Sequence, residues 1–163
     1  MEISMMECFM NRLRKAPLPP ARKIYFAHPV NTYYTPIEEE FLELIRQKFM
    51  GYTIINPSDP AHRLVVDKLK RDKSDTNVLA YLRGLILPCY AVAVLPFPDG
   101  MWCADEWSEA EIALAHKKEV WVFDFYSKTL AFLNRLEHDY ALSIEETKVR
   151  TYNLPERTIR PYL

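Results

Sequence analysis

Glycine is scarce in this sequence, with three residues among 163, so the common glycine-rich phosphate-binding loops are absent. A GxGxxG dinucleotide loop and a Walker A loop both need glycines where the backbone approaches phosphate closely. Cysteine is scarce as well: Cys8, Cys89 and Cys103 are odd in number and form no CxxC pair. This pattern favours a reduced, cytoplasmic protein over a disulfide scaffold, and the few scattered His and Cys make no closed zinc site. We expect neither a metal nor a cofactor.

Long apolar runs and an excess of one charge are also missing. No run approaches the roughly 20 apolar residues of a membrane-spanning helix. The 21 basic and 22 acidic residues leave a formal net charge of -1. Such a balance gives no basic field for a nucleic acid polymer or an anionic membrane. Arg12, Arg14 and Lys15 follow the first apolar residues, whereas a secretory signal carries its charge first.

The chain has the length and the apolar content of one ordinary domain. Hydrophobic residues make up 49% of the sequence, which is enough for a core. We predict a single domain over residues 23–163, preceded by an extension over residues 1–22. In that extension Ile3, Met6 and Met10 repeat at helical spacing. The spacing indicates either a short amphipathic helix or a frayed terminus.

Apolar runs alternate with helical patterns along the domain. This order predicts an α/β fold: a Rossmann-like or flavodoxin-like parallel sheet of about five strands with helices on both faces. The last helix is expected over 127–140, and the edge strand over 146–154. The other expected strands cover residues 23–30, 52–57, 90–97 and 119–125, with helices over 36–50, 78–87 and 105–118 between them.

Carboxylates are crowded just after the third expected strand. The stretch 98–115 reads PDGMWCADEWSEAEIALA and holds two Asp and three Glu, without Lys, Arg or His. In parallel sheets ligands bind outside the carboxyl ends of the strands. The acidic stretch therefore lies on the edge where a functional site is expected.

Two of these acids point in different directions. Successive helical residues are rotated by about 100°, so Glu109 and Glu111 face nearly opposite ways. Glu111 shares its face with Trp107 and Leu114, which predicts that Glu111 is the inward carboxylate. The alternative is an ordinary helix Glu paired with a Lys or Arg elsewhere.

An inward carboxylate suits chemistry at a sugar. Attack at an anomeric carbon passes through a positively charged state, which a carboxylate can stabilise or bond to. Asp105 or Asp99 could then handle the proton. Trp102 and Trp107 could offer a flat face to a sugar or a base, or could simply belong to the core.

The runs IYFAHPV (24–30) and ADEWSEAEIALAHKKEVWVF (104–123) together resemble the nucleoside 2-deoxyribosyltransferase family and its N-hydrolase relatives, which cleave nucleoside 5'-monophosphates. The resemblance implies cleavage or transfer at an N-glycosidic bond, with Glu111 as nucleophile. It implies that Asp105, six residues earlier, positions the sugar or handles protons. It also implies that Tyr25, on the first strand, lies near the nucleophile. Members are typically dimers or larger, so we expect a homodimer or higher homo-oligomer.

The loop after the first strand, HPVNTYYTP, supplies further candidates. His28, Asn31 and Tyr34 could hydrogen-bond a sugar or base, or could form an ordinary polar loop. The loop lacks the glycine and arginine of the phosphate-binding hydrolases, so the need for a 5'-phosphate stays open.

Three functions remain compatible with the sequence. The first is an enzyme acting on a nucleoside or nucleotide, either as a hydrolase or as a transferase. The second is a non-catalytic nucleotide- or sugar-binding module of the same fold. The third is a protein-interaction domain, which predicts no small-molecule pocket along the edge at 97–105.

Overall fold

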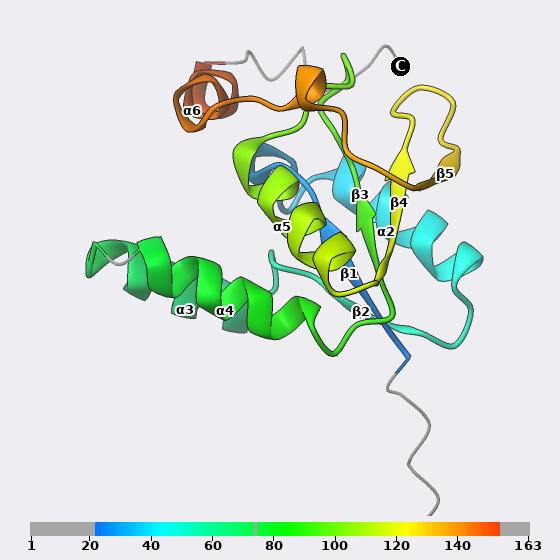
Figure 1. Ribbon diagram of the computed structural model, residues 1–163, viewed down its shortest axis with the longest axis horizontal. Coiled ribbons are helices and arrows are strands. Elements are labelled where there is room, and N and C mark those ends of the chain that lie inside the picture. The colour runs from blue at the N-terminus through cyan, green and yellow to red at the C-terminus, as the bar shows by residue number, and fades with distance from the viewer. Residues whose placement is uncertain (1–21, 74, 154–163) are drawn as a thin grey trace, which may run out of the picture.

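The computed structural model describes residues 22–73 and 75–153 (Figure 1), and the predicted N-terminal extension lies almost wholly outside them. Its five-stranded sheet has the order β2-β1-β3-β4-β5. Strands β1 to β4 run parallel and β5 runs antiparallel to β4. The predicted α/β class is confirmed, and the sheet, which was predicted to be parallel, is mostly parallel. The elements are β1 (Lys23–Ala27), η1 (Val30–Thr32), α2 (Pro36–Lys48), β2 (Thr53–Ile55), α3 (Pro60–Arg71), α4 (Asp75–Ile86), β3 (Ala91–Val94), α5 (Ala104–Ala115), β4 (Glu119–Phe123), β5 (Leu130–Leu133), η2 (His138–Tyr140) and α6 (Ile144–Asn153).

Local sequence signals set the start and the end of α2. The Thr35 side chain accepts a hydrogen bond from the Glu38 N–H at 3.3 Å, and Pro36 occupies the first turn, where no amide hydrogen is needed. The helix ends before Gly51, whose φ of +80° few other residues adopt at low cost. None of the described helices is long and apolar enough to cross a membrane.

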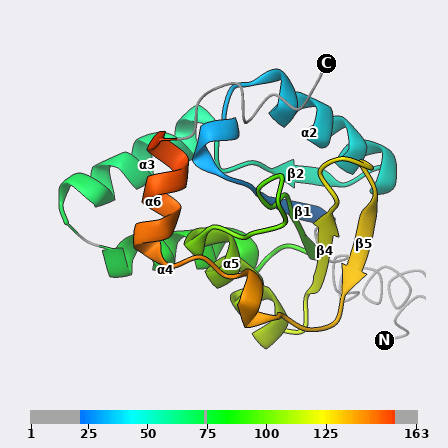
Figure 2. The same ribbon diagram turned by 90° about the horizontal axis from the view of Figure 1, so that it is seen from above.

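The central strand β1 presents different neighbours on its two faces. Ile24 and Phe26 cluster with the apolar residues of α2, whereas Tyr25 and Ala27 cluster with residues of α5. Figure 2 shows α2 on one side of the sheet and α5 on the other. The chain therefore passes from β1 to α2 on one face of the sheet, and from β3 to α5 on the opposite face. A crevice for a ligand is expected at the carboxyl ends of these two strands, where the winding direction changes.

The helix predicted over 127–140 is wrong. The chain turns back after β4, because the Asp124 carboxylate accepts hydrogen bonds from the N–H groups of Tyr126 at 3.1 Å and Ser127 at 2.7 Å. This turn lets β5 pair with β4, and the short helix η2 follows. Pairing along the open edge of β4 satisfies backbone groups that a helix would leave unpaired on that strand.

The edge strand predicted over 146–154 is also wrong, because α6 occupies this segment. Its start is a capping box: the Ser143 N–H donates to Glu146 Oε2 at 2.8 Å, and the Glu146 N–H donates to Ser143 Oγ at 3.2 Å. The helix is joined to the start of α5, since the Ala104 N–H donates to Thr147 Oγ1 at 2.9 Å. An Arg150–Asp99 ion pair of 2.6 Å adds a second link. As a result, α6 lies beside the carboxyl edge of the sheet.

Candidate functional site

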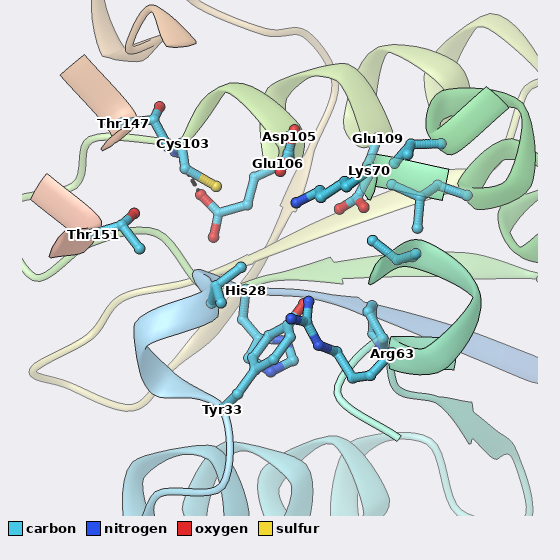
Figure 3. Close-up of a pocket in the computed structure, with 15 residues that line it drawn as sticks. His28, Tyr33, Arg63, Lys70, Cys103, Asp105, Glu106, Glu109, Thr147 and Thr151 are labelled. Atoms are coloured by element: carbon cyan, nitrogen blue, oxygen red, sulfur yellow. Dashed lines mark hydrogen bonds between the residues drawn. The ribbon is translucent and has the colours of Figure 1, made fainter. Parts of the chain in front are cut away.

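A pocket of about 50 Å³ lies beside the carboxyl end of β1, bounded by α3, α4, α5 and α6 (Figure 3). This volume has room for a few water molecules. The walls combine acids from α5 with bases from α3 and hydroxyl groups from α6. The polar residues that line it are His28, Tyr33, Arg63, Lys70, Cys103, Asp105, Glu106, Glu109, Thr147 and Thr151.

The centre of the site is a hydrogen bond between β1 and α5. Tyr25 and Glu109 are both buried, and the Tyr25 hydroxyl donates to Glu109 Oε1 at 2.7 Å. Burial raises the pKa of Glu109 to about 8, even though the hydrogen bond from Tyr25 acts to lower it. Burial likewise raises the pKa of Tyr25, so its hydroxyl remains a donor. The pair holds one acid that changes charge near neutral pH, which is typical of catalytic carboxyl groups.

The prediction that Glu111 is the inward carboxylate is wrong. Its side chain is exposed, whereas Glu109 is 5% exposed and meets Tyr25. The helix packs on the sheet through Ala110 and Ala113, which are completely buried. Glu109 lies about 40° from Ala113 around the helix, whereas Glu111 lies about 160° from it. The small alanines, rather than the bulky residues at 107 and 114, define the inward face.

A sequence signal for this face existed. Glu106, Glu109, Ala110 and Ala113 have the spacing i, i+3, i+4 and i+7, which is one stripe of an α-helix. Two of the four residues are acidic and two are small, so the stripe does not stand out as hydrophobic. Alanine permits a close approach of helix and sheet, and it thereby brings the Glu109 carboxyl group within reach of a tyrosine on β1.

Two further acids line the pocket. Glu106 is 1% exposed, and its Oε2 accepts a hydrogen bond from the Cys103 N–H at 2.8 Å. Burial raises the pKa of Glu106 well above its usual range. Asp105 lines the same pocket, as expected for a site residue, but its side chain is exposed. Of the three acids in the pocket, Glu106 and Glu109 are therefore buried and Asp105 is exposed to solvent.

His28 forms part of the wall, but both of its ring nitrogens are engaged. Nδ1 lies 3.1 Å from the Phe26 carbonyl oxygen, and Nε2 lies 2.9 Å from Glu38 Oε1. Both partners are acceptors, so both bonds require a hydrogen on the ring nitrogen. Burial acts to raise the pKa of Glu38, but hydrogen bonds from His28, Ser58 and Asn56 outweigh it and lower that pKa to about 2. The His28 side chain is also completely buried and its ring stacks on Phe26 at 4.0 Å, so neither ring nitrogen is free to bind a ligand.

Three other sequence candidates do not line the pocket. Tyr34 is 69% exposed, and its hydroxyl donates to the Ser58 carbonyl. Asp99 pairs with Arg150 on the surface. The Asn31 amide is buried and has no hydrogen-bond partner among the described residues. The structure does not bring these side chains to the acid pair.

The two tryptophans lie at a different cavity. The Trp102 and Trp107 rings meet edge to face, with centroids 5.8 Å apart and planes at 71°. Together with Leu133, Leu136 and Tyr140 they line a second cavity of about 300 Å³. Neither ring lines the pocket of Glu109, so the proposed stacking on a substrate at the acids has no support from their position.

A basic wall faces the acids and was missed from the sequence. Arg63 and Lys70 reach the pocket from α3. The Arg63 guanidinium lies 5.5 Å from the centre of the Tyr33 ring and pairs with Asp67 at 3.0 Å. The basic character of the α3 segment was visible in the sequence. Its position beside α5, however, depends on contacts between α3, α4 and α5. The wall brings positive charge to a site that would otherwise be acidic.

Among the described residues, no cluster of three or more His, Cys, Asp or Glu is arranged to hold a metal ion. Comparisons with protein-family models, curated proteins and solved structures found no match. Function is therefore inferred from the pocket and from the resemblance of the two short motifs.

Proposed function

We propose that this protein cleaves or transfers at the N-glycosidic bond of a nucleoside or nucleotide, with Glu109 as the nucleophile in place of Glu111. The observation that supports this proposal is the buried hydrogen bond from Tyr25 to Glu109 at the edge of the sheet. The motif resemblance implies this pair of groups: an acid on the helix after the third strand and a tyrosine on the first. The structure has such a pair, two positions from the acid that the motif spacing favoured.

The reaction begins at the free oxygen of Glu109. Tyr25 holds Oε1, which leaves Oε2 to attack the anomeric carbon. As the new C–O bond forms, the glycosidic C–N bond breaks and its electron pair leaves with the base. The carboxylate compensates the positive charge that develops on the sugar. Water or a second base then attacks the anomeric carbon and releases the Glu109 carboxylate, which gives hydrolysis or transfer.

The basic wall favours a phosphorylated substrate. Arg63 and Lys70 line the pocket opposite the acids of α5. An Arg–Lys pair is a suitable partner for a phosphate group, because arginine binds phosphate in a bidentate manner and lysine adds a point charge. We therefore expect a nucleotide to be used better than the corresponding nucleoside.

The test is a panel of nucleosides and nucleoside 5'-monophosphates, ribo and deoxy, with free base measured by chromatography. The parent releases base from at least one member. Glu109→Gln reduces this release roughly a thousandfold or more, because the nucleophile is lost. The matched control, Glu111→Gln, changes an exposed acid on the same helix and keeps nearly full activity. Equal loss in both variants, or none in Glu109→Gln, contradicts the assignment.

A second candidate is a binding module without turnover. With a pKa of about 8, the Glu109 carboxyl group is about tenfold more often protonated than ionised at pH 7. A neutral acid can donate a hydrogen bond to a ligand but is a poor nucleophile. In this case calorimetry detects saturable nucleotide binding, no base is released over hours, and Glu109→Gln retains the affinity. The third alternative, a pure protein-interaction domain, predicts neither saturable nucleotide binding nor base release.

Oligomeric state is a separate part of the proposal. The motif resemblance predicts a homodimer or higher homo-oligomer. Light scattering after size-exclusion chromatography measures the mass of the assembly, and a monomer at micromolar concentration contradicts this part alone.

A further inference from the structure

One oxygen of Glu106 has no hydrogen-bond partner among the residues that the structure describes. Oε2 accepts the Cys103 N–H, while Oε1 is buried and makes no hydrogen bond within the described chain. A buried carboxylate in this position would leave a charge unpaired, which is very unfavourable. Burial accordingly raises the pKa of Glu106 well above its usual range, which favours the neutral acid. Because Oε2 accepts a hydrogen bond, the proton belongs on Oε1, which has no acceptor among the described residues.

Glu106 and Glu109 face the same pocket. They are three residues apart on α5, so their Cβ atoms are about 5–6 Å apart on one side of the helix. Figure 3 shows both carboxyl groups directed from α5 into the pocket, Glu109 towards the basic wall and Glu106 towards His28 and Thr151. Retaining glycosidases likewise use one carboxyl group as the acid and a second as the nucleophile, one on each side of the scissile bond. The scissile bond then lies along α5, with its carbon at Glu109 and its nitrogen towards Glu106.

We propose that Glu106 is the general acid that protonates the departing base and then the general base that activates the incoming water. This assignment rests on the proposed N-glycosidic activity. In the first step Glu109 bonds to the anomeric carbon, the C–N electron pair goes to the base, and the proton on Glu106 is transferred to that base. In the second step the Glu106 carboxylate takes a proton from water as the water oxygen attacks the anomeric carbon. The C–O bond to Glu109 breaks, and both acids return to their starting state.

Glu106 fits this role better than Asp105, which the sequence suggested. A general acid must keep its proton in neutral water until the leaving group accepts it. Asp105 is exposed, so water stabilises its charged form, whereas Glu106 is 1% exposed. Oε1 has no partner among the described residues, so a bound base can accept its proton. Thr147 and Thr151 of α6 line this end of the pocket.

The competing explanation is that Glu106 only caps α5 through Cys103. Glu106→Gln separates the two roles, since the glutamine oxygen still accepts the Cys103 N–H but the side chain has no acidic proton. The substrates are the nucleoside or nucleotide that the parent cleaves best, and a 4-nitrophenyl glycoside of the same sugar. Nitrophenolate leaves without prior protonation, whereas a nucleobase needs a proton.

The first turnover is measured with the full-length parent, Glu106→Gln and Glu109→Gln. We expect Glu106→Gln to slow base release by roughly 100-fold or more and to change nitrophenolate release less than about fivefold, because general acid catalysis contributes about 10²–10⁴-fold. In Glu106→Gln, nitrophenolate then appears as a burst of one equivalent, because the water that attacks the Glu109 intermediate has no general base. Glu109→Gln stops both reactions.

The outcomes separate this proposal from the proposed function. Equal slowing of both substrates by Glu106→Gln, without a burst, shows a structural cap and overturns the role of Glu106 alone. Base release that persists in Glu109→Gln overturns the nucleophile assignment. A parent that releases neither product overturns the proposed function and the role of Glu106 with it. Thermal unfolding and circular dichroism of each variant confirm that the compared proteins are folded.

Discussion

Replacing Tyr25 with phenylalanine tests the hydrogen bond on which the nucleophile depends. Tyr25→Phe removes one oxygen atom and keeps the ring in its buried position on β1. Glu109 then loses the 2.7 Å hydrogen bond to its Oε1, while its burial is unchanged. The charged form of Glu109 becomes less favourable, so its pKa rises above the value of about 8 in the parent.

The size of the change follows from the strength of the lost bond. A hydrogen bond to a charged group contributes about 1.5–3 kcal/mol. One pKa unit corresponds to about 1.36 kcal/mol, so the pKa of Glu109 rises by roughly one to two units. Activity requires the carboxylate and therefore increases as the pH rises through this pKa. At pH 7 we expect kcat/KM to fall roughly 10- to 100-fold, and the loss to shrink at pH values above the parent pKa.

The assay is a pH–rate profile of kcat/KM for base release between pH 6 and 10. The matched control is Tyr90→Phe, which removes a tyrosine–glutamate hydrogen bond of 2.6 Å to Glu119 Oε1 at an exposed site. We expect the rise in activity to move to higher pH in Tyr25→Phe and to stay unchanged in Tyr90→Phe. A profile of Tyr25→Phe that rises at the same pH as the parent, or at a lower one, refutes the role of Tyr25. So does an equal shift in the control.

Two further predictions concern the scaffold. The hydrogen bonds to Glu38 lower its pKa from 4.5 to about 2, so the stability that they add is complete above about pH 4.5 and is lost as the pH falls towards 2. We expect the difference in unfolding free energy between parent and Glu38→Gln to shrink by about 2 kcal/mol from pH 5 to pH 3, and urea titrations measure it. Ala113→Leu, at the contact of α5 with the sheet, costs about 1–3 kcal/mol through overpacking, whereas the exposed Ala115→Leu costs almost nothing. Equal melting temperatures of these two variants would show that α5 is not closely packed on the sheet at Ala113.

The fold class was predictable because its signals are local. The strand Ala91–Val94 is apolar and buried throughout, as expected for the centre of a parallel sheet. The cap at Thr35 and the turn at Gly51 bound α2 by chemistry that needs no distant partner. The capping box of Ser143 and Glu146 is a local signal of the same kind, and it predicts α6 once it is noticed. The strand β5 was harder to predict from the sequence, because its conformation depends on pairing with β4.

The region of the site was also predictable, but its inward face was not. The acidic stretch lies at the carboxyl edge, and Tyr25 meets an acid of that stretch. The choice between Glu109 and Glu111 depended on which side of α5 touches the sheet, and large apolar residues were the wrong guide. Trp107 packs on Trp102 at the second cavity, so its direction does not report the face that meets β1. The bases from α3 depend on packing between helices that are distant in the sequence.

The two buried acids are difficult to explain by packing alone. Glu106 and Glu109 are at most 5% exposed, and burial raises the pKa of each. Apolar side chains of similar volume would avoid the cost of removing a carboxyl group from water. At Glu106 this cost is greater, because one oxygen has no hydrogen-bond partner within the described part of the chain. Local rules of this kind are broken mainly where function requires it. Glu106→Met together with Glu109→Leu should therefore raise the melting temperature while abolishing base release. A lower melting temperature in this double variant would mean that the acids stabilise the fold, and their burial would then no longer point to catalysis.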